Sequence, residues 1–270
     1  MEHINLTKEK ITIIVPYKSG HTLLYSTFIH LFKHYNIDFT IGATTDNFLE
    51  NVYVFVRNPL DRFFSSYNWF EEMYLRGDGD DNTIPRIKKY KESCNITDLK
   101  SYIRNYNEFI KICDDYHFLP QTSQILYSSS KNITITKKQP ISDIEFEYNK
   151  KLGPNYKIFR VEEINDTIKI NKDILNINGV GFFNKINNTL FNSDIKIFDF
   201  LNPFDDNLNS MFMIFYVYFK NLFDESGHHK KQTYLDKISE EDFCLSYLLI
   251  KREFDFFGYK PNEIDVKKLK

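Results

Sequence analysis

Hydrophobic positions in the first third of the chain switch between a strand-like and a helix-like spacing. Short β-branched runs predict strands at 11–15, 37–41 and 52–56. Apolar residues three and four apart predict helices at 21–35 and 60–75. Because helices separate strands and little room is left for hairpins, we expect an α/β fold with a central parallel sheet flanked by helices.

The remainder of the chain shows the same two spacings. Residues 76–86 are polar and contain two glycines, which predicts an exposed loop. Further helices and strands are expected at 97–112, 133–138, 156–161, 208–223 and 240–257. The last helix should end at Gly258. No internal repeat or low-complexity linker divides the sequence, so we expect one domain over 1–270.

Composition narrows the class of protein. A net charge of -2 and a pI near 6.4 give no general attraction to nucleic acid. The N-terminus is polar, and the apolar run 211–219 is too short to span a bilayer, so we expect a soluble cytoplasmic protein without a membrane anchor. The three cysteines do not form a disulfide or zinc pattern, and no metal site is expected. The aromatic stripes at 211–219 and 254–259 are expected in the core, with sugar stacking as the alternative.

The segment "VPYKSGHT" joins the first predicted strand to the first helix. A strand that ends in a short loop before a helix presents backbone N–H groups and the positive end of the helix dipole, which suits an anion. Gly20 lets a ligand approach the backbone, Lys18 adds charge, and Ser19 and Thr22 add hydroxyl donors. The nucleotide-hydrolase loop differs, since its lysine follows the second glycine. An ordinary turn with an exposed lysine is the alternative.

A second group of polar residues follows the strand at 52–56. Arg57 lies at its carboxyl end, and Ser65 lies one turn inside the next helix. Since functional groups of a parallel sheet gather at the carboxyl ends of its strands, Lys18 and Arg57 should line one crevice. The planar guanidinium of Arg57 suits a second phosphate. Arg62 is expected on the helix surface.

These segments resemble the sulfotransferases that use 3′-phosphoadenosine 5′-phosphosulfate (PAPS). "PYKSGHT" is similar to their PKxGxT loop, and "VRNPLDRFFSSY" to their VRDPxxRxxSxY motif. "YHFLPQ", "FRVEEI" and the segment 228–259 resemble later motifs of the carbohydrate (Golgi-type) members and their bacterial and viral relatives. Residues 76–96 and 165–225 match no motif. Tyr17 is an extra residue between the proline and the lysine, and Asn58 replaces a common acid, so Lys18 is aligned by its distance from Gly20.

The resemblance implies a P-loop-like nucleotide-binding sulfotransferase fold and transfer of a sulfuryl group from PAPS, leaving adenosine 3′,5′-bisphosphate (PAP), with no metal required. The 5′-phosphosulfate would be held by the first loop, the 3′-phosphate by the second motif, and the nucleotide would be closed over by a C-terminal basic loop. The residues with these roles are Lys18, Ser19, Gly20, His21, Thr22, Arg57, Ser65, Lys230, Lys231 and Thr233. Lys18 would also compensate charge on the leaving phosphate.

The general base is open at this point. His117 is supported by its motif, with a buried structural histidine as the alternative. Asp46 follows a predicted strand between the two phosphate motifs, and Asp38 and Glu50 lie in the same interval. Gln121 is expected to be a substrate-site or packing amide, and Glu162 a helix-start or orienting acid.

Three functions stay open from the sequence. The leading one is sulfation of a hydroxyl or amine, with a glycan as the expected acceptor. A non-catalytic PAPS- or PAP-binding module would keep the same nucleotide contacts, and a nucleotide-dependent kinase would need a GK[ST] loop that the sequence does not show. The acceptor itself is not readable, because loops such as 76–96 and 178–205 set specificity.

Overall fold

The computed structural model describes most of the N-terminal half of the chain and the last long helix. The described residues are 2–43, 48–75, 83–113, 115–126, 145, 149–153, 155–162, 216 and 238–260. Asp46, Lys230, Lys231 and Thr233 lie outside them, as do the strand predicted at 133–138 and, apart from Tyr216, the helix predicted at 208–223.

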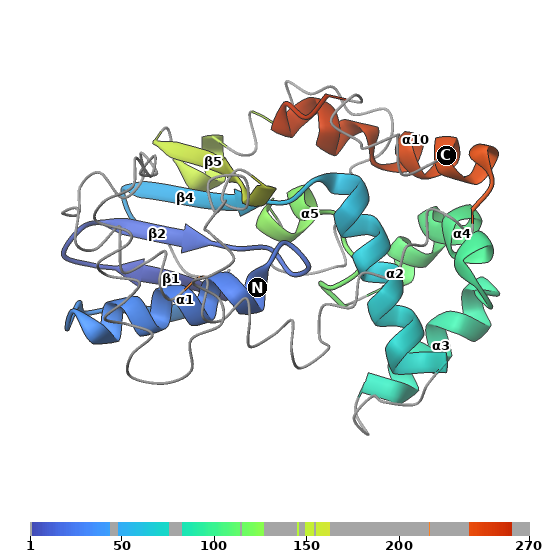
Figure 1. Cartoon of the computed structure of the whole chain (residues 1–270), viewed down its shortest axis with the longest axis horizontal. Coiled ribbons are helices and arrows are strands. Elements are labelled where there is room, and N and C mark those ends of the chain that lie inside the picture. Colours follow the sequence, from blue (N-terminus) through green and yellow to red (C-terminus); the bar gives the residue numbers. More distant parts are fainter. Residues whose placement is uncertain are drawn as a thin grey trace, which may run out of the picture.

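A five-stranded mixed sheet organises the described residues (Figure 1). Its strands are β1 (Glu2–Leu6), β2 (Ile11–Ile14), β3 (Thr40–Ala43), β4 (Asn51–Val56) and β5 (Tyr156–Arg160), in the order β3-β1-β2-β4-β5. The neighbouring strands β2, β4 and β5 are parallel, with Ile14 opposite Val54 and Val56 opposite Arg160. The carboxyl ends of these three strands therefore meet at one edge of the sheet.

The expected parallel sheet is found in part, because antiparallel strands extend the parallel ones. β1 forms an antiparallel hairpin with β2 and pairs antiparallel with β3 on its other side. The polar N-terminal sequence concealed this strand, because His3 is fully buried and Asn5 accepts a hydrogen bond from the hydroxyl of Thr12, 2.6 Å away. Polar residues that satisfy one another across strands remove the apolar alternation on which strand prediction depends.

Six helices accompany the sheet in the described part of the chain: α1 (His21–His34), α2 (Pro59–Leu75), α3 (Thr83–Cys94), α4 (Leu99–Ile112), α5 (Gln121–Leu126) and α10 (Glu240–Phe257). Figure 1 shows α2, α3, α4 and α10 gathered beyond the carboxyl ends of β2 and β4. α10 packs against α2 and α4. The Asp98 carboxylate caps α4 in a capping box, and Gly258 ends α10 with a left-handed φ of 69°.

Most predicted helices and strands are confirmed with shifts of one or two residues at their ends. The exceptions have local causes. The strand expected at 37–41 is β3, which begins only at Thr40, and the loop expected at 76–86 was wrong from Thr83 onward, where α3 begins. Proline is tolerated in the first turn of a helix, so Pro85 does not prevent α3. The short helix α5 was not predicted.

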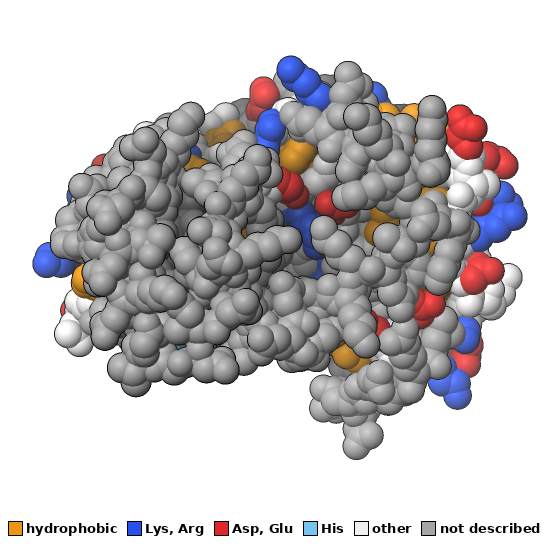
Figure 2. All heavy atoms as spheres, viewed as in Figure 1, with side chains coloured by type: hydrophobic (Ala, Val, Ile, Leu, Met, Phe, Trp, Pro, Cys, Tyr) orange, Lys and Arg blue, Asp and Glu red, His pale blue; other side chains and the backbone are white. Residues whose placement is uncertain are grey.

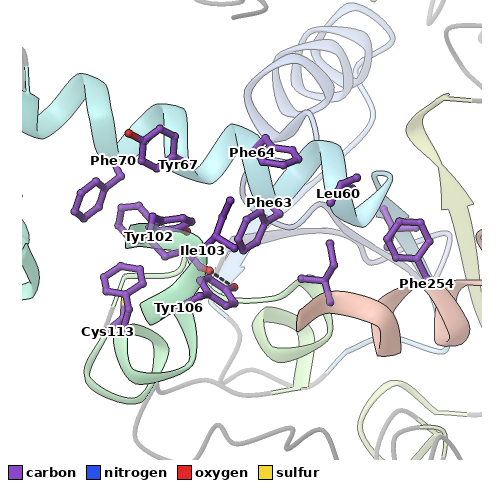
Figure 3. Close-up of a cluster of buried hydrophobic side chains, with 14 of the residues drawn as sticks. Leu60, Phe63, Phe64, Tyr67, Phe70, Tyr102, Ile103, Tyr106, Cys113 and Phe254 are labelled. Atoms are coloured by element: carbon purple, nitrogen blue, oxygen red, sulfur yellow. Dashed lines mark hydrogen bonds between the residues drawn. The ribbon is translucent and has the colours of Figure 1, made fainter. Parts of the chain in front are cut away.

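Aromatic side chains from α2, α4 and α10 form the core beside the sheet (Figure 3). The ring of Phe63 lies 4.9 Å from that of Tyr106 in an edge-to-face contact and 5.4 Å from that of Tyr102 in a tilted one. Phe254 and Phe257 are buried as well, so the aromatic stripe at 254–259 belongs to the core, as expected. This core fixes α2, the helix that carries several site residues.

The visible surface over the helices carries mixed charge. Figure 2 shows acidic and basic side chains interspersed along the right edge of the view, where the described surface is exposed. Among the described helices, none combines the length and the apolar character that a membrane crossing needs.

Candidate functional site

Two features of the loop between β2 and α1 favour binding of an anion at the start of the helix. Gly20, the N-cap of α1, has a left-handed φ of 79° and offers no side-chain cap, and the first turn of α1 contains no acid. The first N–H groups of the helix are therefore not capped by a side chain at this position. A Cβ at Gly20 would lie 3.6 Å from Val161 at the end of β5.

Lys18 adopts a left-handed conformation with φ of 67°, which is costly for a residue with a side chain. Glycine would fit this backbone better, yet lysine occupies it. Its Nζ lies 4.3 Å from the centre of the Trp69 ring, in a cation–π contact. Burial lowers the pKa of Lys18 to about 8, against partial compensation by Glu72. At neutral pH the side chain is still mainly cationic.

One fully buried amide joins the loop to the end of β4. The Gln121 Oε1 atom accepts hydrogen bonds from the Ser19 hydroxyl at 2.6 Å and from the Arg57 N–H at 2.8 Å. Its Nε2 group donates to the Arg57 carbonyl at 2.8 Å. Gln121 is thus a packing amide that sets the spacing between the loop and the end of β4. The Ser19 hydroxyl already donates its hydrogen bond to this amide.

Arg62 is buried, with 2% of its surface exposed, so the expectation of a surface residue was wrong. Its Nε donates to the Tyr17 carbonyl at 3.3 Å and its Nη2 to the His117 carbonyl at 3.1 Å. The Gln124 Oε1 atom, on α5, accepts the Tyr17 N–H at 2.7 Å. Charged and amide side chains therefore tie the loop before Lys18 to the segment that carries His117.

The Arg57 side chain lies against the backbone of Lys18. The Arg57 Nη1 atom lies 3.5 Å from the Lys18 carbonyl oxygen, so the guanidinium reaches across the end of β2 to the loop. Ser65 lies on the α2 face between Arg62 and Trp69, since it follows the first by three residues and precedes the second by four. Thr22 is exposed in the first turn of α1.

Five rings contact one another in succession beside the loop. His21 contacts Tyr25 at 4.2 Å and Tyr17 at 4.6 Å between ring centres, and His117 lies 4.5 Å from Tyr17 and 5.0 Å from Trp69. Burial lowers the pKa of His21 to about 4, helped by the nearby His117, so its ring is neutral at pH 7. The His21 Nε2 and Trp69 Nε1 atoms are buried and have no hydrogen-bond partner among the described groups.

Among the candidate bases in the described residues, His117 is the one that lies close to Lys18. Its Nδ1 lies 2.7 Å from the Asp115 carboxylate, and its ring contacts the same indole as the Lys18 ammonium. Asp38 is exposed, and Glu50 forms a surface ion pair with Lys10 at 3.0 Å. Asp46 cannot be compared, since it lies outside the described residues.

A second network lies at the end of β5. The Glu162 carboxylate accepts the Asn58 N–H at 2.7 Å and the Tyr259 hydroxyl at 2.8 Å. The Asn58 Oδ1 atom then accepts the Leu60 N–H at 3.0 Å at the start of α2. Glu162 is therefore an orienting acid that connects β4, β5 and the end of α10.

Three contributors were missed by sequence reasoning. Trp69 is the only tryptophan in the chain and lies seven residues after Arg62, two helical turns along α2. Asp115 precedes His117 by two residues, and Gln124 follows Gln121 by three on one face of α5. Their spacing was visible, but the groups they contact lie elsewhere in the sequence.

Compared with protein-family models, curated proteins and solved structures, the chain matches none. The geometry of the site and the sequence motifs are thus the grounds for assigning a function.

Proposed function

We propose that the protein is a sulfotransferase that moves the sulfuryl group of PAPS to an acceptor hydroxyl or amine, with a carbohydrate as the acceptor class. One observation carries the proposal: the Arg57 guanidinium lies 3.5 Å from the Lys18 carbonyl, beside the uncapped start of α1. Two cationic groups at the carboxyl ends of neighbouring parallel strands suit a ligand with a phosphate at each end.

The charges of the described residues and the uncapped start of α1 support binding of such a nucleotide. The α1 N-terminus, with Gly20 as its left-handed N-cap, would hold the 5′-phosphosulfate, and Arg57 with Ser65 would hold the 3′-phosphate. Lys18 would move from the Trp69 ring toward the bridging oxygen, where negative charge grows as the sulfur–oxygen bond breaks. Loose transfer of this kind depends on positioning and on charge compensation.

Calorimetry with PAP tests the proposal. PAP should bind without magnesium, and ATP, which lacks the 3′-phosphate, should bind far more weakly. The single tryptophan gives a second signal, because Trp69 contacts Lys18 and its emission should change when the ammonium leaves the ring. Absence of PAP binding would refute the proposal.

Labelled-sulfate transfer from PAPS to a panel of glycan, lipid and small-molecule acceptors then separates the enzyme from a binding module. Transfer to a glycan supports the full proposal. Tight PAP binding without transfer to any acceptor would favour a non-catalytic nucleotide-binding protein. ATP binding that requires magnesium would favour a kinase.

A further inference from the structure

The Asp115 carboxylate orients the imidazole ring of His117. The same Asp115 carboxylate oxygen lies 2.7 Å from the His117 Nδ1 atom and accepts the His117 backbone N–H at 2.8 Å. Asp115 is 15% exposed and His117 is 30% exposed in their side chains. Because a carboxylate oxygen only accepts, the neutral ring donates from Nδ1, and Nε2 carries the available lone pair.

The His117 ring also contacts two other rings, and its backbone accepts a hydrogen bond. Tyr17 and Trp69 stack on it at interplanar angles of 37° and 22°. Arg62 donates to the His117 carbonyl, and through the Tyr17 carbonyl it fixes the neighbouring loop as well. The imidazole is therefore positioned relative to Lys18, which contacts the same indole.

We propose that Asp115 is a positioning residue that holds His117 as the base for the acceptor, an inference that rests on the proposed function. The Nε2 lone pair of His117 takes the proton of the acceptor hydroxyl while the acceptor oxygen bonds to sulfur. The bond from sulfur to the 5′-phosphate oxygen breaks, and its electron pair stays on PAP. Asp115 remains ionised and compensates the positive charge that forms on the ring.

A simpler role for Asp115 is to cap its own turn through the His117 N–H. Asparagine at 115 separates the two roles. Its Oδ1 atom still accepts the backbone N–H, so the turn is kept, whereas the negative charge beside the ring is lost. Asp255→Asn makes the same chemical change at a carboxylate that pairs with Lys251 on α10 and serves as the matched control.

Nitrogen NMR of protein labelled in histidine tests the orientation without any acceptor. The seven histidines are distinguished by the loss of one signal in His117→Gln. We expect the neutral His117 ring to be protonated at Nδ1 in the wild type and to become a mixture of both forms in Asp115→Ala. Protonation at Nε2 in the wild type, or an unchanged form in Asp115→Ala, would overturn the inference.

Kinetics test the catalytic consequence with any acceptor that the panel identifies. Asp115→Asn should lower kcat about tenfold or more with PAP affinity within about twofold of wild type, whereas Asp255→Asn should change neither. In a His117→Gln background, Asp115→Asn should cost nothing further, because the charge no longer faces a base. If Asp115→Asn lowers kcat by the same factor in the wild-type and His117→Gln proteins, Asp115 acts only on the fold and the inference is overturned.

The two proposals fail separately. If the wild type does not bind PAP, the sulfotransferase assignment fails, whatever the His117 protonation. If PAP binds and sulfate is transferred while Asp115→Asn keeps the wild-type rate, the nucleotide site stands and only the role of Asp115 is lost.

Discussion

Replacing Lys18 with methionine should stabilise the protein while it removes nucleotide binding. The wild-type site holds a charged group where burial opposes the charge, as the fall in its pKa from 10.5 to about 8 indicates. At about 1.4 kcal/mol for each tenfold change in proton affinity, that fall corresponds to roughly 3 kcal/mol. Loss of the cation–π contact with Trp69 reduces this stabilisation by about 1 kcal/mol. The free energy of unfolding of Lys18→Met should therefore exceed that of the wild type by about 2 kcal/mol at pH 7.

The gain should depend on pH in a defined direction. Below pH 8 the lysine is protonated in both the folded and the unfolded chain, and the full cost of burying the charge is present. Between pH 8 and 10.5 the unfolded chain binds more protons than the folded one, so wild-type stability rises with pH. The advantage of Lys18→Met should shrink across this window. Nucleotide affinity of the wild type should fall over the same range, because the ammonium loses its charge.

Urea unfolding at pH values from 6 to 10 measures both effects, with wild type and Lys18→Met compared at each pH so that other titrating groups cancel. Lys251→Met is the control, since Lys251 is largely exposed and its pKa is raised by Asp255. That variant should gain no stability. A Lys18→Met protein no more stable than wild type at pH 7, or a difference that stays constant with pH, would refute the account of Lys18 as a desolvated cation.

Three further changes test the site and its frame. Arg57→Ala should weaken PAP binding about tenfold to a hundredfold by calorimetry and abolish sulfate transfer with the fold retained; full activity would contradict the assignment. Gln121→Ala removes the hydrogen-bond partner of the Ser19 hydroxyl and of the Arg57 N–H and carbonyl, and should cost about 3 kcal/mol in chemical denaturation; a loss under about 1 kcal/mol would mean that Gln121 does not join Ser19 to Arg57 as described. Gly258→Ala should lower thermal stability by about 1–2 kcal/mol, because φ is 69° and the new Cβ would meet the Arg160 guanidinium at 3.2 Å; an unchanged melting temperature would count against the left-handed cap.

The strand, loop and helix around Lys18 were predictable because their signals are local. A β-branched run specifies β2, spaced apolar residues specify α1, and Gly20 marks the turn between them. Parallel pairing of β2 with β4 then brings Lys18 and Arg57 to one edge of the sheet. This proximity was predictable because the carboxyl ends of neighbouring parallel strands lie at the same edge of a sheet.

Residues whose partners are distant in sequence were not predictable in the same way. Arg62 has the pattern of an ordinary helix-surface arginine. Carbonyls of Tyr17, Tyr116 and His117, which approach it from two other segments, accept its hydrogen bonds and make its burial possible. His3 and Asn5 hid β1 for a similar reason. Local periodicity does not encode which backbone acceptors will surround a polar side chain.

Tyr17 explains how the loop can carry one more residue than the PKxGxT pattern. Its N–H and carbonyl are fixed by Gln124 and Arg62, and its ring fills the space between His21 and His117. The additional residue is thus absorbed before Lys18, so the spacing from Lys18 to Gly20 is unchanged. Lys18 takes the left-handed conformation at the point where the chain turns toward α1. The residue that interrupts the resemblance to the PKxGxT loop therefore supplies a ring that contacts both His21 and the candidate base His117.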